Sequence, residues 1–271
     1  MSIKRQVPVA CPAFSAPVNT LTFDFPNGQV VPLHFHPEDQ LVYACRGVMS
    51  VQTSDGTWVV PPQRAVWIPA KTPHSIIMSG SVSMRTLYLR ARMAHSLPRT
   101  CCVVNVSSLL KELILHACTF PALTKRVRVQ ARLIDVILDQ LETVQSIPLQ
   151  LPNPSDARAV RVAKILSDDP SDPRPLEEIC QHTGASKRTI ERLFHLETHM
   201  TLGEWRRQLR LLRSMRLLAA DEKITHVALE AGYSTPSSFI AMFRKVFGTT
   251  PGRYFEKPNF DKSRESKRLV L

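Results

Sequence analysis

The sequence predicts an α+β chain of two domains, an N-terminal antiparallel β barrel with flanking helices and a C-terminal all-α domain. Three observations predict this fold class. Residues 21–90 consist of short runs rich in Val, Ile, Thr and Trp, which Pro and Gly interrupt as they do between strands. From residue 109 onward, apolar residues recur at helical spacing. Residues 147–155 contain three prolines, which exclude a regular helix or a central strand and indicate a linker.

Changes of pattern along the chain give the predicted domain boundaries. Seven or eight strands would close a small barrel or jelly roll. The two amphipathic helices that follow either pack on the barrel or form a dimer interface, and both roles stay open. The predicted segments are the barrel domain 1–98, the helical hairpin 99–146, the linker 147–155, the all-α domain 156–257 and a basic tail 258–271.

Composition restricts the class of protein. Lys and Arg exceed Asp and Glu by 12 among 271 residues, which favours a polyanionic partner because neutralised phosphates release counterions. No run approaches the roughly 18 apolar residues of a membrane-spanning helix, and residues 1–14 lack the apolar core of a secretory signal. The six cysteines form no CxxC pair, as expected for reduced thiols. We therefore expect a cytoplasmic protein that does not contact membranes.

An internal repeat in the all-α domain is the strongest signal in the chain. Gly184 and Ser186 recur as Gly232 and Ser234 at an offset of 48, and five further positions hold identical or similar residues at an offset of 49. Each unit has a short helix, a turn with glycine where positive φ is needed, and a second helix capped by Ser or Thr. This order predicts two helix–turn–helix units, residues 176–197 and 224–247.

In the first unit, Ile190, Leu193 and Phe194 share one helix face, and burial of this face leaves polar side chains on the opposite one. Arginine can bond guanine with two hydrogen bonds and glutamate can accept one from cytosine. A solvated helix face is the alternative for this stretch by itself, and the repeat argues against it. The expected DNA contacts are Arg188, Glu191 and Arg192 with bases, Lys187 with phosphate, and His195 on the same face.

Residues 202–218 lie between the units and are predicted to form one helix. At 1.5 Å per residue it is about 25 Å long, which suits two units placed near the ~34 Å repeat of B-DNA. Two successive major grooves then come within reach of one chain. Arg206 and Arg213 of this helix are further candidates for phosphate contact.

The second unit resembles the AraC/XylS family of bacterial transcription regulators, most specifically in AGYSTPSSFIAMFRKVFGTTPGRY. The resemblance covers about residues 156–256 and implies sequence-specific promoter binding near the nucleoid, activation or repression, contact with RNA polymerase, and a homodimer. The family's outward positions of the second unit are here Pro236, Ser237, Ile240 and Ala241, a less polar set than in the first. We therefore expect the second unit to hold phosphates, through Ser234, Thr235, Ser237 and Arg244.

The histidines of the barrel domain resemble cupin motifs. Gly28, His34, His36 and Gly47 match the first motif, with Gln40 in place of its acid, and Pro69 with His74 matches the second in part. His34, His36 and His74 could bind a divalent transition metal ion, since alternation sends the first two to one face. Pocket or core histidines that hydrogen-bond to neighbours are the alternative.

The interior of the barrel is the expected effector site, an apolar pocket with a few polar groups. The layout resembles cupin-bearing AraC members that often govern a neighbouring small-molecule exporter. The alternative class is a dioxygenase-like, metal-dependent cupin enzyme fused to a DNA-binding module, although no catalytic residue is apparent in the sequence. The residues expected to line the pocket are His34, Phe35, His36, Gln40, Tyr43, Trp67 and His74.

Overall fold

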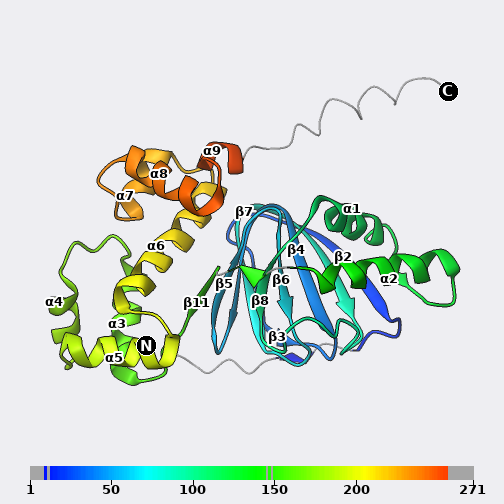
Figure 1. The fold of residues 1–271 in the computed structure, drawn as a ribbon, viewed down its shortest axis with the longest axis horizontal. Helices are drawn as coiled ribbons and strands as arrows, with labels where there is room; N and C mark the ends of the chain where they lie inside the picture. The colour runs from blue at the N-terminus through cyan, green and yellow to red at the C-terminus, as the bar shows by residue number, and fades with distance from the viewer. Residues whose placement is uncertain (1–8, 11–12, 145, 148, 256–271) are drawn as a thin grey trace.

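A computed structural model of the chain describes residues 9–10, 13–144, 146–147 and 149–255. The predicted basic tail, 258–271, lies outside these residues. A curved antiparallel sheet forms the N-terminal domain, with α1 and α2 on one side and the helical domain α3 to α9 on the other (Figure 1). The predicted fold class is therefore confirmed.

Eleven strands form the sheet within the described part of the chain. The strands run in the order β1-β3-β7-β4-β6-β8-β10, with β2 on β7, β5 on β4, β9 on β2 and β11 on β5, and all pairs except β1 with β3 are antiparallel. The strands are β1 (Val9–Ala10), β2 (Val18–Phe25), β3 (Val30–Phe35), β4 (Asp39–Thr53), β5 (Gly56–Val60), β6 (Arg64–Ile68), β7 (His74–Leu89), β8 (Cys102–Asn105), β9 (Ala122–Leu123), β10 (Ser146–Ile147) and β11 (Gln150–Pro152).

The long strands β4 and β7 organise the sheet. Their register shifts on either side of Arg46, and the adjacent Gly47 has φ of 72°, a left-handed conformation that glycine adopts without steric cost. These irregularities let β4 pair with β6 near its start and with β5 near its end. The curvature of the domain follows from them.

Helices α1 (Ser108–Ala117) and α2 (Arg128–Glu142) cover the outer face of the sheet. Leu110, Ile114 and Ile134 of these helices pack in one buried cluster with Leu41 and Tyr43 of β4. The packing role predicted for the helical hairpin is therefore observed, while the dimer role stays a prediction.

Two predicted boundaries are wrong. The sheet does not end at residue 98, because Cys102–Asn105 forms β8 and pairs with β6. The predicted linker 147–155 contains β11, which pairs with β5. Its prolines do not prevent this pairing, because β11 lies at an edge and Pro152 is its last residue.

Strand β11 holds the two domains together through alternate residues. On one edge, Val59 donates its amide to the carbonyl of Leu149 at 3.0 Å, as part of the pairing with β5. On the other edge, the indole of Trp205 donates to the Pro152 carbonyl at 2.8 Å and the Gln208 amide donates to the Gln150 carbonyl at 3.2 Å. The proposed linker is thus a strand fixed between the sheet and the helical domain.

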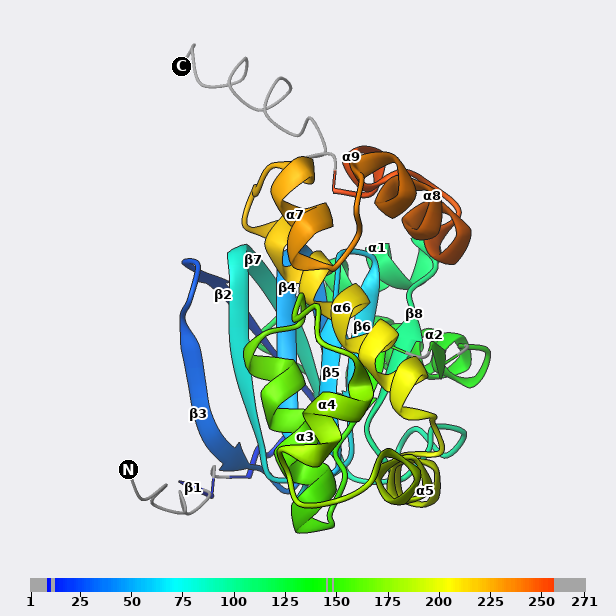
Figure 2. The ribbon, with the colours of Figure 1, turned by 90° about the vertical axis from the view of Figure 1, so that its left-hand side faces the viewer.

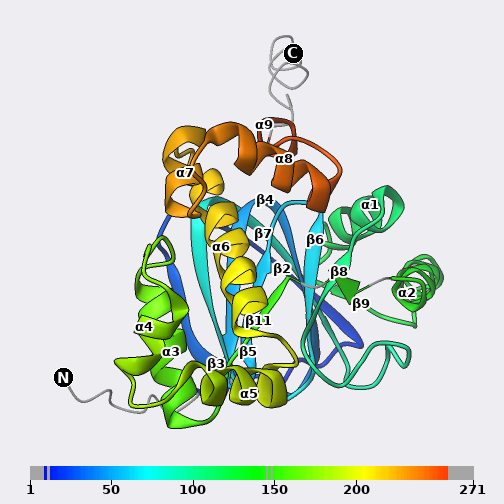
Figure 3. The same ribbon diagram turned by 60° about the vertical axis from the view of Figure 1, so that its left-hand side comes forward.

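The helical domain contains both predicted helix–turn–helix units, α4 with α5 and α7 with α8, joined by α6. Thr201 caps α6 and Glu204 completes a reciprocal capping box. Figure 3 shows α6 lying across the sheet, where it contacts β4, β7 and β11. The helices are α3 (Ala157–Asp168), α4 (Leu176–Gln181), α5 (Lys187–Thr198), α6 (Leu202–Ala219), α7 (Ile224–Glu230), α8 (Pro236–Phe247) and α9 (Pro251–Tyr254).

A single substitution at Gly80 should disturb the contact between the domains. Gly80 and Gly28 both have left-handed backbones, with φ of 72° and 80°. A Cβ at Gly28 meets nothing within 4 Å, whereas at Gly80 it would overlap the carbonyl oxygen of Ala219 at the end of α6. We expect Gly28→Ala to lower the free energy of unfolding by about 1–2 kcal/mol through strain alone. Gly80→Ala should lower it further and expose residues 147–155 to protease.

Urea unfolding and limited proteolysis of the two variants measure this difference, with Gly28→Ala as the matched control. Equal losses of stability and equal cleavage rates would contradict the close approach of α6 to the sheet.

Candidate functional site

The turns of the two helix–turn–helix units have the same backbone conformation at their glycines. Gly184 and Gly232 have φ of 77° and 71°, as the repeat predicts. Ser186 begins α5 by accepting a hydrogen bond from the Thr189 amide, and Thr235 begins α8 by accepting one from the Ser238 amide. Because Thr235 caps α8 through its side-chain oxygen, it is less available for the predicted phosphate contact.

Helix α5 exposes a basic stripe. Ile190 and Phe194 are buried, and the Phe194 ring packs edge-on against Trp205 with centroids 5.5 Å apart. The opposite face carries Arg188, Arg192 and His195, which are exposed at spacings of four and three residues. These three side chains have the placement predicted for contact with DNA.

Two other predicted contacts of α5 already have partners within the domain. The half-buried carboxylate of Glu191 accepts a hydrogen bond from the Leu202 amide at 3.1 Å, which satisfies a free donor at the start of α6. Lys187 forms an ion pair with Glu177 at 2.6 Å. Such a surface pair contributes little, so phosphate can replace the carboxylate, whereas base contact by Glu191 would leave the α6 terminus without this acceptor.

The predicted phosphate contacts of α6 are also engaged inside the domain. Arg206 donates to the Asp172 carbonyl, and burial lowers the pKa of its guanidinium. Arg213 lies 3.9 Å from the carboxylate of Glu230 in α7. The structure therefore assigns both arginines to contacts within the domain, Arg206 with the loop before α4 and Arg213 with α7, which their positions on a spacer helix could not reveal.

Helix α8 presents a different surface. Ser234, Ser237 and Arg244 are exposed as predicted, and Lys245 is an exposed basic residue that the sequence analysis missed. The sequence signal for Lys245 is its place in an Arg-Lys pair directly after the buried Phe243. Ser237, Ile240, Ala241, Arg244, Lys245 and Thr250 line a shallow hollow.

Both second helices lie at opposite ends of α6, with α5 near its beginning and α8 near its end (Figure 2). The 18 residues of α6 span about 27 Å at 1.5 Å per residue. This arrangement suits contact with successive turns of a DNA duplex.

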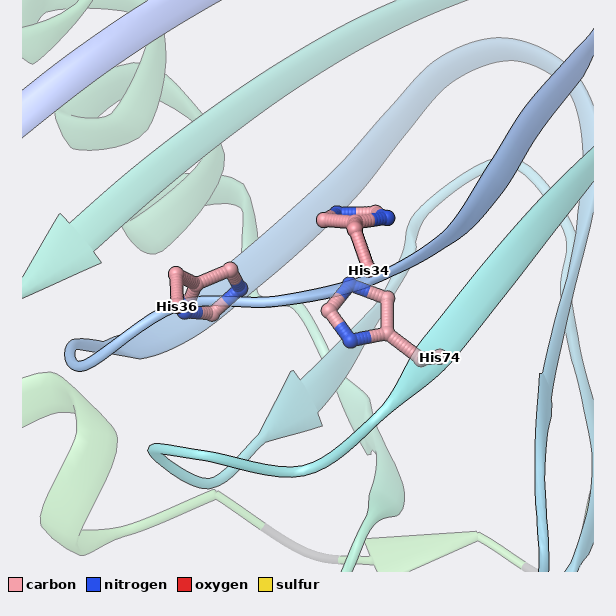
Figure 4. A group of neighbouring side chains, drawn as sticks. All are labelled: His34, His36 and His74. Carbon is pink, nitrogen blue, oxygen red and sulfur yellow. The ribbon is translucent and has the colours of Figure 1, made fainter. Parts of the chain in front are cut away.

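A second candidate site lies in the sheet domain, where His34, His36 and His74 form a histidine cluster (Figure 4). One ring nitrogen of each lies within 4.8 Å of those of the others. His34 comes from β3 and pairs in register with His74 at the start of β7. The same-face prediction for His34 and His36 is therefore correct.

Backbone carbonyls fix all three imidazole rings in the same way. Nδ1 of His34, His36 and His74 lies 2.8 Å from the carbonyl oxygens of Pro32, Glu38 and Thr72, respectively. Nδ1 therefore carries the proton, and the Nε2 lone pair of a neutral ring remains available. Burial lowers the pKa of His36 and lowers that of His74 to about 3, so these rings stay neutral. Nε2 of His74 is buried and has no partner among the described residues.

Gln40 supplies a fourth polar group to the histidine cluster. Its side-chain oxygen lies 3.0 Å from Nε2 of His36, and its nitrogen donates to Thr86. Two acceptors at this distance repel unless a proton or a cation lies between them. Rotation of the amide by 180° would instead make the contact a hydrogen bond to His36.

The predicted effector pocket divides between the two faces of the sheet. His36, Gln40 and His74 lie together, whereas Tyr43 and Trp67 belong to the cluster beneath α1 and α2. The Trp67 indole donates to the Pro98 carbonyl at 3.0 Å. Phe35 is half-buried and lies between two histidines along the chain, so alternation turns it away from them.

Comparisons with known proteins match both domains. Residues 20–151 match a family model described as an AraC-like ligand-binding domain, and residues 179–257 match a helix-turn-helix domain. The transcriptional regulator NimR of Escherichia coli K12 is 31% identical over 226 residues, which are 83% of this chain and 82% of NimR. The regulatory protein SoxS of Salmonella typhimurium is 35% identical over 83 residues, 30% of this chain and 78% of SoxS.

Among solved structures, fatty-acid-bound ToxT from Vibrio cholerae aligns with 88% of this chain and 94% of its own, at 12% identity and a TM-score of 0.37. The matched domains and the relatives define a transcriptional regulator with a ligand-binding domain and a helix–turn–helix DNA-binding domain. The chain belongs to the AraC family. The named relatives are regulators, which decides against the enzyme alternative.

In the part of the chain that the structure describes, every helix is too short or too polar to cross a bilayer.

Alanine at Arg188 or Arg192 should cost about 1–3 kcal/mol in free energy of binding to the preferred site and relax specificity at one base pair. The matched control is Lys245→Ala, which should weaken binding to all sequences alike and reduce the salt slope by about 1. Competition binding with single-base variants of the preferred site, at several salt concentrations, measures both effects. A sequence-independent loss for both arginine variants would refute base contact by α5.

Proposed function

We propose that the protein binds promoter DNA with α5 and α8 in successive major grooves and activates or represses transcription in response to a small molecule. The exposed stripe of Arg188, Arg192 and His195 carries this proposal, because these side chains can reach base edges while the opposite face of α5 is buried. In α8, Ser237, Arg244 and Lys245 would hold phosphates. Specificity would then come mainly from the first unit.

The proposal extends to partners and location. We infer a cytoplasmic homodimer on paired sites that contacts RNA polymerase, and a target promoter that belongs to a neighbouring small-molecule exporter. The family layout supports these points, and exposed apolar side chains on α2, such as Val129 at 68% exposure, are compatible with a dimer.

We also propose that the histidine cluster binds one divalent transition metal ion. The residues fit such an ion, because three imidazoles with their Nδ1 protons fixed by carbonyls present Nε2 lone pairs within 4.8 Å. The Gln40 oxygen, 3.0 Å from Nε2 of His36, is the fourth candidate ligand. A bound ion would supply positive charge and a Lewis-acid centre in the interior of the sheet domain, and the histidines would link β3 to β7 through it.

Capture of sheared genomic DNA tests the regulator proposal. Purified protein is mixed with the fragments at moderate salt, and retained DNA is sequenced. We expect sharp enrichment of one or a few promoter regions, whose genes would show whether an exporter is regulated. Retention without sequence preference, with and without extracts containing small molecules, would refute sequence-specific binding.

Metal analysis tests the histidine cluster. After incubation with Zn²⁺, Mn²⁺ or Ni²⁺ and gel filtration, we expect one retained ion per chain by plasma mass spectrometry. His74→Ala should retain none, and His34→Gln, at a half-buried position, should retain less. His182→Ala, outside the cluster, is the control and should bind as wild type. Circular dichroism establishes that each variant is folded, and an ion-free wild-type protein would refute the site.

A further inference from the structure

A cavity of about 240 Å³ lies where the sheet domain meets the end of the DNA-binding domain. We call it the junction cavity. The sheet domain contributes β4, the turn at residues 62–63 and the start of α1, while the other domain contributes the end of α6 and residues 254–255. Figure 3 shows α9 and the end of α6 above this end of the sheet, beside α1. The histidine cluster does not line it.

Tyr43 gives the junction cavity a polar group without a protein partner. Its side chain is 2% exposed and lines the cavity, and its hydroxyl forms no hydrogen bond with the residues that the structure describes. Burial raises the pKa of this phenol, so the hydroxyl keeps its proton and can donate. The hydroxyl is not among the fully buried atoms without a partner, so it is reachable from the cavity and can donate to an acceptor bound there.

The charges around the cavity favour a negative ligand. Ser107 and Ser108 at the N-terminus of α1 line it, and the first turn of this helix contains no acidic residue to offset the positive end of the helix dipole. Arg46 and Lys111 add two cations, against the single carboxylate of Asp221. Two further carboxylates lie near the cavity and both are already paired: Glu112 lies 3.4 Å from Lys111 and is 69% exposed, and Asp24 lies 3.5 Å from Arg85 and is 74% exposed.

Apolar groups form the remaining walls. Val106 comes from the sheet domain, Leu218 from α6 and Phe255 from the end of the DNA-binding domain. The volume lies below the roughly 300–1,000 Å³ of pockets for drug-sized ligands, so the occupant must be small.

We propose that the junction cavity is an effector site for a small organic acid with a compact apolar or aromatic body. Its carboxylate accepts a hydrogen bond from Tyr43 and faces the start of α1, while its body contacts Leu218 and Phe255. This inference rests on the proposed ligand-responsive regulation and moves the effector site from the interior of the sheet domain to the boundary between domains.

The position of the cavity explains how such a ligand would change DNA binding. Leu218 and Ala219 belong to the last turn of α6, which carries both helix–turn–helix units. A ligand that contacts both domains binds more tightly when α6 lies against the sheet than when it does not, and so it shifts the population toward the docked arrangement. Because α6 carries both helix–turn–helix units, the affinity of the protein for DNA changes with the population of the docked arrangement.

Fluorine NMR of the full chain with 4-fluorobenzoate tests the proposal, with 4-fluorobenzamide as the uncharged probe. We expect saturable binding of the benzoate and weaker binding of the amide. Tyr43→Phe should weaken benzoate binding about tenfold or more, the effect of one hydrogen bond to a charged acceptor. Ser108→Trp, at an exposed cavity position, should block binding, whereas Leu109→Trp places the same side chain on the next residue, outside the cavity lining, and should bind as wild type.

DNA affinity for the captured promoter fragment is measured in the same samples. Saturating 4-fluorobenzoate should change it about fivefold or more in wild type and not in Ser108→Trp. Absent benzoate binding, equal binding in Ser108→Trp, or binding without a change in DNA affinity would each overturn the effector site. DNA binding measured without the probe distinguishes a failure of the effector site from a failure of the regulator proposal. If only the effector site is wrong, the protein still binds DNA sequence-selectively; if the regulator proposal is wrong, it does not.

Discussion

The attachment of β11 to both domains determines the arrangement of the molecule. On one edge, the carbonyl of Leu149, just before β11, accepts a hydrogen bond from the Val59 amide of β5. On the other edge, the carbonyls of Gln150 and Pro152 face α6 and accept from the side chains of Gln208 and Trp205, respectively. Pro152 can occupy this strand because the amide proton it lacks would point away from β5. Without these bonds α6 would have only side-chain packing to fix it on the sheet.

The position of α6 determines that of both helix–turn–helix units. Buried residues of the sheet and of the helical domain form one continuous cluster, in which Val48 and Trp58 of the sheet share a core with Trp205 and Phe194. Glu191 and Arg206 add polar contacts from α5 to α6 and from α6 to the loop before α4. The side chains proposed to contact DNA are therefore held on helices that the sheet domain supports directly, and a ligand in the junction cavity would contact the same helices.

The sequence predicted the features that depend on local chemistry. The repeated glycines and caps located the helix–turn–helix turns, and the HxH spacing brought His34 and His36 together. Features that depend on tertiary contacts were not accessible. Alternation along β4 places Gln40 and Tyr43 on opposite faces of the sheet, whereas the predicted pocket groups them by chemical type. An arginine or glutamate on a helix surface looks available for DNA until the backbone group that it bonds, such as the Leu202 amide for Glu191, is located.

The two acceptors that hold α6 on β11 are main-chain carbonyls, at Gln150 and Pro152. Any residue that keeps an extended backbone at positions 150 and 152 can supply them, whereas Leu149 and Leu151 are buried in the core that both domains share. A short, proline-rich stretch between domains is usually taken for a flexible tether. In this protein the same stretch contains a strand that is hydrogen-bonded to both domains, and its proline content would not reveal this attachment.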